Sequence, residues 1–316
     1  METYLIVLVV LFAAIFIGLV FNYMYKQTNY YKNQFVDAVK FKDKEFAAKI
    51  DIVNLGSNHP KFAFDYSDLT VNGMNWAIGP QSFEYDFRIL KEYHRLLNKE
   101  AFVIIPVCPL KFFLHRYSYD SANYKYYKIL DSSLINNYSP ITKLLHIDYP
   151  ILTAKRNVLR LVKDVSIDNR MVFETNPMKD EELKADAKKW INGWLKQFSL
   201  DSLETSILSK KNEDNIQTNI SILKEMIDFC LERKYQPILV TLPLTNYLLD
   251  LIPESFINEH IIGNINKANV KDVLFLNYMK DERFTSEDLY FNSFFFNRKG
   301  RKLFTKEIVN QLTNKQ

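Results

Sequence analysis

The apolar residues of this 316-residue chain follow one pattern at its beginning and another in its body. From Tyr4 to Tyr23 the chain carries no charge and is almost entirely apolar, which is long enough for one helix to cross a bilayer. Tyrosines at both ends of this run suit the aromatic belts of membrane interfaces. A cleaved signal peptide is the alternative, but no basic residue precedes the run and no Ala-x-Ala site follows it. We therefore predict a retained transmembrane anchor over residues 1–25.

The body of the chain alternates between short apolar runs and amphipathic segments. The continuous runs 101–107 and 236–242 are typical of buried parallel strands, and weaker signals predict further strands. These weaker strands lie at 49–55, 71–78 and 270–276. Helical spacing of apolar residues predicts helices at 81–97, 152–162, 181–198, 215–234, 253–268 and 297–313. Such alternation predicts a three-layer, flavodoxin-like α/β fold, with helices on both faces of a parallel sheet.

Two segments do not fit this alternation. Residues 26–49 form a juxtamembrane connector, either a plain linker or a short amphipathic helix at the headgroup level. Residues 112–153 contain seven tyrosines and lie inside the α/β domain that we assign to residues 50–316. We interpret them as an insertion or lid at the carboxyl edge of the sheet. They are either an aromatic platform for sugars or a tyrosine-rich surface excursion.

Composition removes several classes of function. The 41 basic residues are set against 37 acidic ones without a concentrated basic patch, so nucleic-acid binding is not indicated. Cys108 and Cys230 both lie in apolar surroundings, which favours buried thiols over a disulfide between them. No phosphate-binding loop or dinucleotide fingerprint is present, and the histidines show no metal-ligand spacing. We expect no cofactor and no metal.

Residues 52–59, which read Ile-Val-Asn-Leu-Gly-Ser-Asn-His, are the most informative stretch. An apolar run ends on a glycine and delivers small polar residues and a histidine at once. Open α/β sheets place their sites in this way, at the carboxyl ends of strands. His59 is the one titratable group in the stretch. It either pairs with Asp65 or Asp68 or is a hydrogen-bonding residue beside the loop.

Three later segments complete a resemblance to a known family. They are 75–82 (Asn-Trp-Ala-Ile-Gly-Pro-Gln-Ser), 241–245 (Thr-Leu-Pro-Leu-Thr) and 291–304 (Phe-Asn-Ser-Phe-Phe-Phe-Asn-Arg-Lys-Gly-Arg-Lys-Leu-Phe). Together with residues 56–66, and in this order, they resemble the conserved blocks of the SGNH (GDSL-like) hydrolases and acyltransferases. The likeness is to the envelope-associated, membrane-anchored branch. It covers most of residues 50–310 and implies the same fold.

The chain departs from this family at each catalytic position. The resemblance places the nucleophilic serine at Asn58, and it places the aspartate and histidine of the final block at Asn292 and Phe295. Gly79 matches the glycine whose backbone N–H contributes to the oxyanion hole. An ester reaction of this type needs a hydroxyl nucleophile, an imidazole base and a carboxylate. Because these three groups are missing together, we predict a degenerate triad.

The resemblance implies a membrane-anchored protein that assists the synthesis or O-acyl modification of a cell-envelope polysaccharide. Its partners would be the bilayer, a multi-spanning membrane O-acyltransferase and an envelope glycan. One alternative is an active O-acyltransferase or esterase with a displaced Ser57 and His59 site, and another is a non-catalytic structural or glycan-binding protein. The sequence leaves open whether the chain is an enzyme.

The distribution of lysines and the family resemblance predict opposite membrane orientations. Five lysines follow the apolar run and no basic residue precedes it, so the positive-inside rule favours a cytoplasmic domain. These lysines are Lys26, Lys32, Lys40, Lys42 and Lys44. Anchored members of the family work on the outer face of the membrane. On this resemblance we expect an extracytoplasmic domain.

Overall fold

The computed structural model describes residues 2–41, 49–114, 123–153, 178–204 and 207–313. The chain forms two compact units, each made from two separate stretches of sequence. Met1–Asp43 and Tyr117–Asn169 make the smaller unit, and Lys44–Arg116 and Arg170–Gln316 make the larger one. The helix predicted at 152–162 lies outside the described residues from residue 154 onward.

The larger unit is built on a parallel sheet which, in the described residues, has five strands in the order β2-β1-β3-β4-β5. The strands are β1 (Ile50–Asn54), β2 (Gly73–Asn75), β3 (Leu97–Val107), β4 (Gln236–Thr241) and β5 (Phe275–Asn277). This order is that of the flavodoxin-like doubly wound sheet, in which the direction of winding reverses between β1 and β3. The predicted α/β fold class is therefore confirmed.

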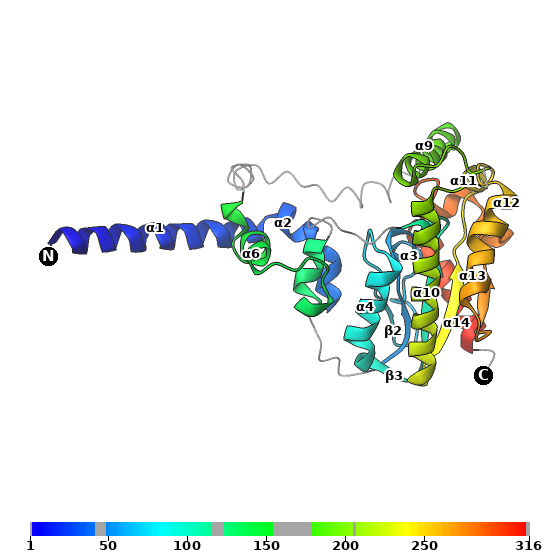
Figure 1. The fold of residues 1–316 in the computed structure, drawn as a ribbon, viewed down its shortest axis with the longest axis horizontal. Helices are drawn as coiled ribbons and strands as arrows, with labels where there is room; N and C mark the ends of the chain where they lie inside the picture. The colour runs from blue at the N-terminus through cyan, green and yellow to red at the C-terminus, as the bar shows by residue number, and fades with distance from the viewer. Residues whose placement is uncertain (1, 42–48, 115–122, 154–177, 205–206, 314–316) are drawn as a thin grey trace. The chain divides into compact units, whose positions relative to one another are not determined.

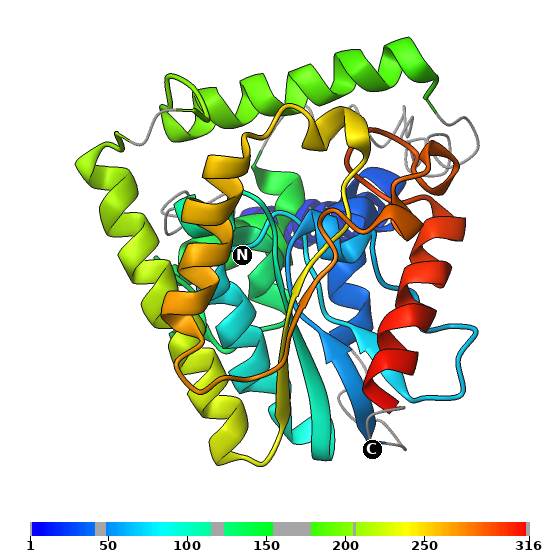
Figure 2. The ribbon, with the colours of Figure 1, turned by 90° about the vertical axis from the view of Figure 1, so that its right-hand side faces the viewer.

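Helices cover both faces of this sheet, because alternate residues of each strand point to opposite sides. Ile52, Ile104 and Val240 lie in one buried cluster with Phe304 and Ile308 of α14 (Arg298–Thr313). The opposite face is covered by α4 (Phe83–Tyr93) and α10 (Lys210–Glu232), which pack against each other through Phe87 and Phe229. Figure 2 shows α14, in red, on one side of the sheet and α10 on the other.

Most predicted elements are present, with boundaries that tertiary contacts have moved. The strand expected at 270–276 is reduced to β5 because Asn269 hydrogen-bonds to both the N–H and the carbonyl of Val273 and holds a turn there. The helix expected at 253–268 is interrupted by a π-helical segment. Its three parts are α12 (Glu254–Phe256), η8 (Ile257–Ile262) and α13 (Gly263–Ala268). The helix expected at 181–198 is α9 (Asp180–Phe198).

The smaller unit combines the N-terminal helix, the connector and the tyrosine-rich insertion (Figure 1). Its first part contains α1 (Glu2–Gln27), α2 (Asn29–Gln34) and η1 (Val36–Phe41). Its second part contains η4 (Tyr124–Lys128), η5 (Ser132–Leu134), α6 (Pro140–Lys143), η6 (Leu144–Asp148) and η7 (Pro150–Leu152). Asn22 donates to the carbonyl of Asp148 (2.9 Å), and the Tyr31 hydroxyl donates to the carbonyl of Ile147 (3.0 Å). The connector therefore contains short helices that hold the insertion.

Two of the described tyrosines of the insertion, Tyr126 and Tyr127, are buried in this unit. Tyr126 is fully buried, and Tyr127 stacks on Tyr138 with ring centroids 5.1 Å apart. Tyr124 stacks on His146 at 4.3 Å. These rings pack against one another and do not form an exposed aromatic platform.

Candidate functional site

The carboxyl end of β1 forms a tight turn at the point where the sheet's winding reverses. Gly56 has φ +121°, and a Cβ there would lie 2.4 Å from Cγ of Pro60. Only glycine meets both demands without strain. The turn leads directly into the short helix α3 (Asn58–Lys61), so the predicted site residues leave β1 where doubly wound sheets bind ligands.

A buried ion pair fixes this turn to the second sequence block. The ammonium of Lys111 lies 2.8 Å from Asp86 Oδ2, and both side chains are 1% exposed. Asp86 Oδ1 accepts from the Gly56 N–H (2.9 Å) and from Gln81 Nε2 (2.5 Å), while Lys111 also donates to the Gln81 carbonyl (2.8 Å). These partners offset the cost of burying the Asp86 carboxylate. The ion pair therefore fixes the positions of Gly56 and Gln81 relative to each other.

Sequence reasoning missed this ion pair. Asp86 lies in the first turn of α4, where acidic side chains commonly face solvent and complement the helix dipole. The available signal was Gln81, which belongs to the second block of the resemblance.

The first and second blocks meet at Asn58 and Gly79. A Cβ built on Gly79 would lie 1.5 Å from Asn58 Oδ1, so the carboxamide of Asn58 packs directly against the Gly79 α-carbon. The Ser57 hydroxyl accepts a hydrogen bond from the backbone N–H of Gln81 (3.0 Å). The position that the resemblance gives to a nucleophile is thus filled by an amide that touches the position it gives to the oxyanion hole.

The final block reaches the same place through a loop at residues 291–296. Asn292 Oδ1 accepts from the backbone N–H groups of Phe294 (2.9 Å) and Phe295 (2.7 Å). The side chain of Asn292 therefore shapes its own loop. The Phe295 ring lies 5.3 Å from the ring of Phe62, the residue that ends α3. The structure brings the predicted residues of the first, second and final blocks together.

His59 is buried beneath the phenylalanines of this loop. Its side chain lies 4.3 Å from the ring of Phe294, and it is 3% exposed. Neither ring nitrogen has a hydrogen-bond partner of ordinary geometry among the residues the structure describes. Burial lowers the pKa of His59 to about 3, although the nearby carbonyl of Pro243 opposes this shift. The imidazole is therefore neutral at pH 7 and is a weak base.

The pairing of His59 with Asp65 or Asp68, one of the two alternatives from the sequence, does not occur in the structure. Asp65 accepts hydrogen bonds from the N–H and the hydroxyl of Ser67, and Asp68 forms an ion pair with Lys302. Both carboxylates are thus engaged elsewhere by closer donors.

The helix α9 is bound to the loop at residues 291–296 by the carboxylate of Asp186. Asp186 Oδ2 accepts from the hydroxyl (2.6 Å) and the N–H (3.1 Å) of Ser293 and from Nε1 of Trp190 (3.1 Å). The rings of Trp190 and Trp194 lie 5.1 Å and 5.4 Å from the ring of Phe294. Figure 2 shows α9, the green helix, crossing beyond the ends of the strands. These residues carried no signal in the sequence, because α9 reads as an ordinary amphipathic helix.

This arrangement offers little for ester chemistry. The Ser57 hydroxyl and the His59 imidazole are not hydrogen-bonded to each other, and aromatic rings pack around the histidine. Within the described ranges, no group of three His, Cys, Asp or Glu side chains is placed to hold a metal ion.

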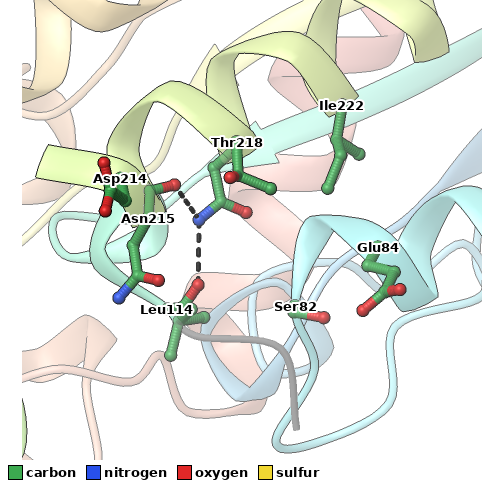
Figure 3. A pocket seen from close by; sticks show the side chains of 8 residues that line it. Ser82, Glu84, Leu114, Asp214, Asn215, Thr218 and Ile222 are labelled. Carbon is green, nitrogen blue, oxygen red and sulfur yellow. Dashed lines mark hydrogen bonds between the residues drawn. The ribbon is translucent and has the colours of Figure 1, made fainter. Parts of the chain in front are cut away.

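A separate cleft of about 350 Å³ lies between α4 and α10 (Figure 3). Ser82 and Glu84 face α10 across it, and its lining includes none of the six predicted site residues. Asn219 of α10 donates to the carbonyls of Phe112 (2.8 Å) and Leu114 (2.9 Å). Much of the polar lining on this side therefore holds the segment after β3 in place.

Comparisons with known proteins find distant likenesses among solved structures. No protein-family model matches the chain, and no curated protein matches it. Among solved structures, the chain is similar to a candidate lipolytic protein of the G-D-S-L family from Desulfitobacterium hafniense DCB-2. The two are 13% identical with a TM-score of 0.35, and the match covers 82% of this chain and 97% of the other. The fold assignment of this chain rests on its own strand order and layers.

Proposed function

We propose that this chain is a membrane-anchored SGNH-like protein that assists the O-acyl modification or synthesis of a cell-envelope polysaccharide without performing ester chemistry itself. One observation carries the second half of the proposal. The carboxamide of Asn58 stands at the position that the family resemblance assigns to the nucleophilic serine, and it packs against Gly79. The envelope setting and a multi-spanning O-acyltransferase as partner come from the resemblance of the four sequence blocks.

Three further features support the proposal that this site does not perform ester chemistry. The Asn292 side chain is occupied by its own loop. Phe295 places a buried ring where a base is required, against Phe62 and Trp190. His59 is a weak base because burial lowers its pKa to about 3. A site filled in this way offers no effective base for proton transfer.

The anchor is proposed from α1. This helix is long and apolar enough to cross a membrane, and its side chains are exposed from Tyr4 through Ile17. We further propose that the α/β unit lies on the outer face of the membrane. A Val270→Cys variant tests this orientation, because residue 270 is 56% exposed in the larger unit. A membrane-impermeant maleimide should label it in intact cells.

The unsubstituted chain is the negative control for this labelling. Burial raises the pKa of Cys108 and of Cys230 to about 12, so these thiols should react poorly with maleimide. Labelling of Val270→Cys only after lysis would place the α/β unit in the cytoplasm, in agreement with the lysines that follow α1. That result would overturn the proposed orientation.

Complementation tests the function. Deletion of the chain should lower the O-acyl content of an envelope polysaccharide, and a Ser57→Ala variant should restore it as well as the wild type does. Failure of Ser57→Ala, together with aryl-acetate turnover by the purified wild type that this substitution abolishes, would instead establish a displaced Ser57 and His59 site. Unchanged O-acylation after deletion would overturn the envelope role.

A further inference from the structure

Three exposed apolar side chains lie on the adjoining short helices α6, η6 and η7 of the smaller unit. Ile141 of α6 is 68% exposed, Leu144 of η6 is 46% exposed, and Leu152 of η7 is 67% exposed. We call the packed segments 29–41 and 123–153 the collar. Large apolar groups exposed on adjoining elements mark a contact with something apolar.

The collar holds these residues beside the final turns of α1. Asn22 donates to the carbonyl of Asp148 (2.9 Å) and accepts from the N–H of Ile151 (3.4 Å), so η7 packs directly on α1. Asn22 lies five residues before the last residue of α1, Gln27, which at 1.5 Å per residue is about 7 to 8 Å inside the helix end. Leu152 follows Ile151, so it lies near the end of the uncharged run, which continues to Tyr25. Figure 1 shows α6 beside this end of α1.

The polar residues of the collar suit a membrane interface. Lys143 is exposed between Ile141 and Leu144, and Lys32 is exposed on α2. Lysines can keep their charge among headgroups while their stems follow apolar surface. Tyr149 is 37% exposed on the segment that binds Asn22, and tyrosine is enriched at the boundary between water and lipid. Apolar groups flanked by lysine and tyrosine are typical of segments that lie in the interface plane.

We propose that the collar is an interfacial segment that lies in the headgroup layer of the bilayer crossed by α1, with Ile141, Leu144 and Leu152 at the boundary of the acyl chains. The occupant of this surface is lipid. Three observations select it: the surface adjoins the end of the apolar helix, carries lysine and tyrosine at its rim, and is held there by Asn22. This inference rests on the proposed membrane anchoring of α1.

Depth-dependent fluorescence tests the collar in the full-length chain. A Leu152→Cys variant is labelled with an environment-sensitive fluorophore and reconstituted in vesicles of phosphatidylcholine and phosphatidylglycerol. We expect quenching by lipids that carry a nitroxide near the headgroup, and iodide quenching severalfold weaker than for a labelled Val270→Cys control. Val270 suits this comparison because it is an exposed apolar residue of the larger unit. Ile141→Cys and Leu144→Cys should behave like Leu152→Cys.

The outcomes separate the collar from the anchor. If the protein floats with vesicles but all three collar probes are as accessible to iodide as the Val270 probe, the collar proposal is wrong and the anchor stands. If the protein does not float with vesicles, both are wrong. Protection from iodide in native membranes, with full accessibility in pure lipid vesicles, would mean that a partner protein covers the surface instead of lipid.

Discussion

Replacing Lys111 by methionine removes one half of the buried ion pair beneath the predicted site. The substitution keeps an apolar stem of similar length but leaves the Asp86 carboxylate, itself 1% exposed, without its counter-charge. At 2.8 Å and an effective dielectric constant near 20, the lost attraction is about 6 kcal/mol. The desolvation cost of the lysine, which also disappears, offsets several kcal/mol of this.

The net cost is set by what remains around Asp86. Its Oδ1 still accepts from Gly56 and Gln81, so the loss should fall in the lower part of the usual range for breaking a buried pair, about 3 to 4 kcal/mol. The Tm should then fall on the order of 10 °C. All three tryptophans, Trp76, Trp190 and Trp194, belong to the larger unit, so their fluorescence during denaturation in detergent reports on that unit.

Two variants provide the comparison. Lys99→Met breaks an exposed ion pair with Glu100 and should change stability by no more than about 0.5 kcal/mol. The double variant Asp86→Asn, Lys111→Met removes both charges but retains an acceptor for the Gly56 N–H, so it should be more stable than Lys111→Met alone. If Lys111→Met unfolds within about 1 kcal/mol of the wild type, the pair does not organise the turn as we describe.

Two further predictions address the residues above the sheet. Because burial lowers the pKa of His59 from an unfolded value near 6.5 to about 3, only the unfolded chain gains this proton between those pH values. Stability should therefore fall as the pH drops below about 6.5, by up to about 1.4 kcal/mol per pH unit, and a His59→Phe variant should lose that part of the acid sensitivity; equal pH profiles for the two proteins would contradict a buried imidazole. Asp186→Ala removes the acceptor of three hydrogen bonds and should cost about 1 to 3 kcal/mol, with faster hydrogen exchange in α9 and in residues 291–296. Lys189→Ala, at an exposed position of the same helix, should leave exchange unchanged, and equal exchange in both variants would show that Asp186 does not hold α9 in place.

The sequence predicted the framework of the fold well, because burial leaves a strong periodic signal. The apolar run of β4 is a buried strand of the sheet, and the stripe of apolar residues along α10 packs against the sheet, as the spacing of each requires. Short edge strands were harder, since β5 is limited by the Asn269 turn rather than by its own apolar residues. The site was predictable where a block of sequence maps onto a turn, as at Gly56.

Other parts of the site depend on contacts that no local pattern encodes. Asp86 looks like a surface residue of a helix, and only its place beneath Gly56 makes it a buried partner of Lys111. Asp186 likewise meets Ser293 across 107 residues of sequence. The packing of Phe294 and Phe295 against Trp190 could not be inferred without the position of α9, and neither could that of Phe294 against Trp194.

The bond between Asn22 and Asp148 spans 126 residues, and this separation sets an order of events during synthesis. At typical elongation rates of about 5 to 20 residues per second, roughly 6 to 25 s pass after Asn22 is made before its partner exists. The strands β1, β2 and β3 are translated in that interval. The last turns of α1 must therefore wait for a segment encoded beyond β1, β2 and β3, and the smaller unit cannot close until residue 151 has left the ribosome.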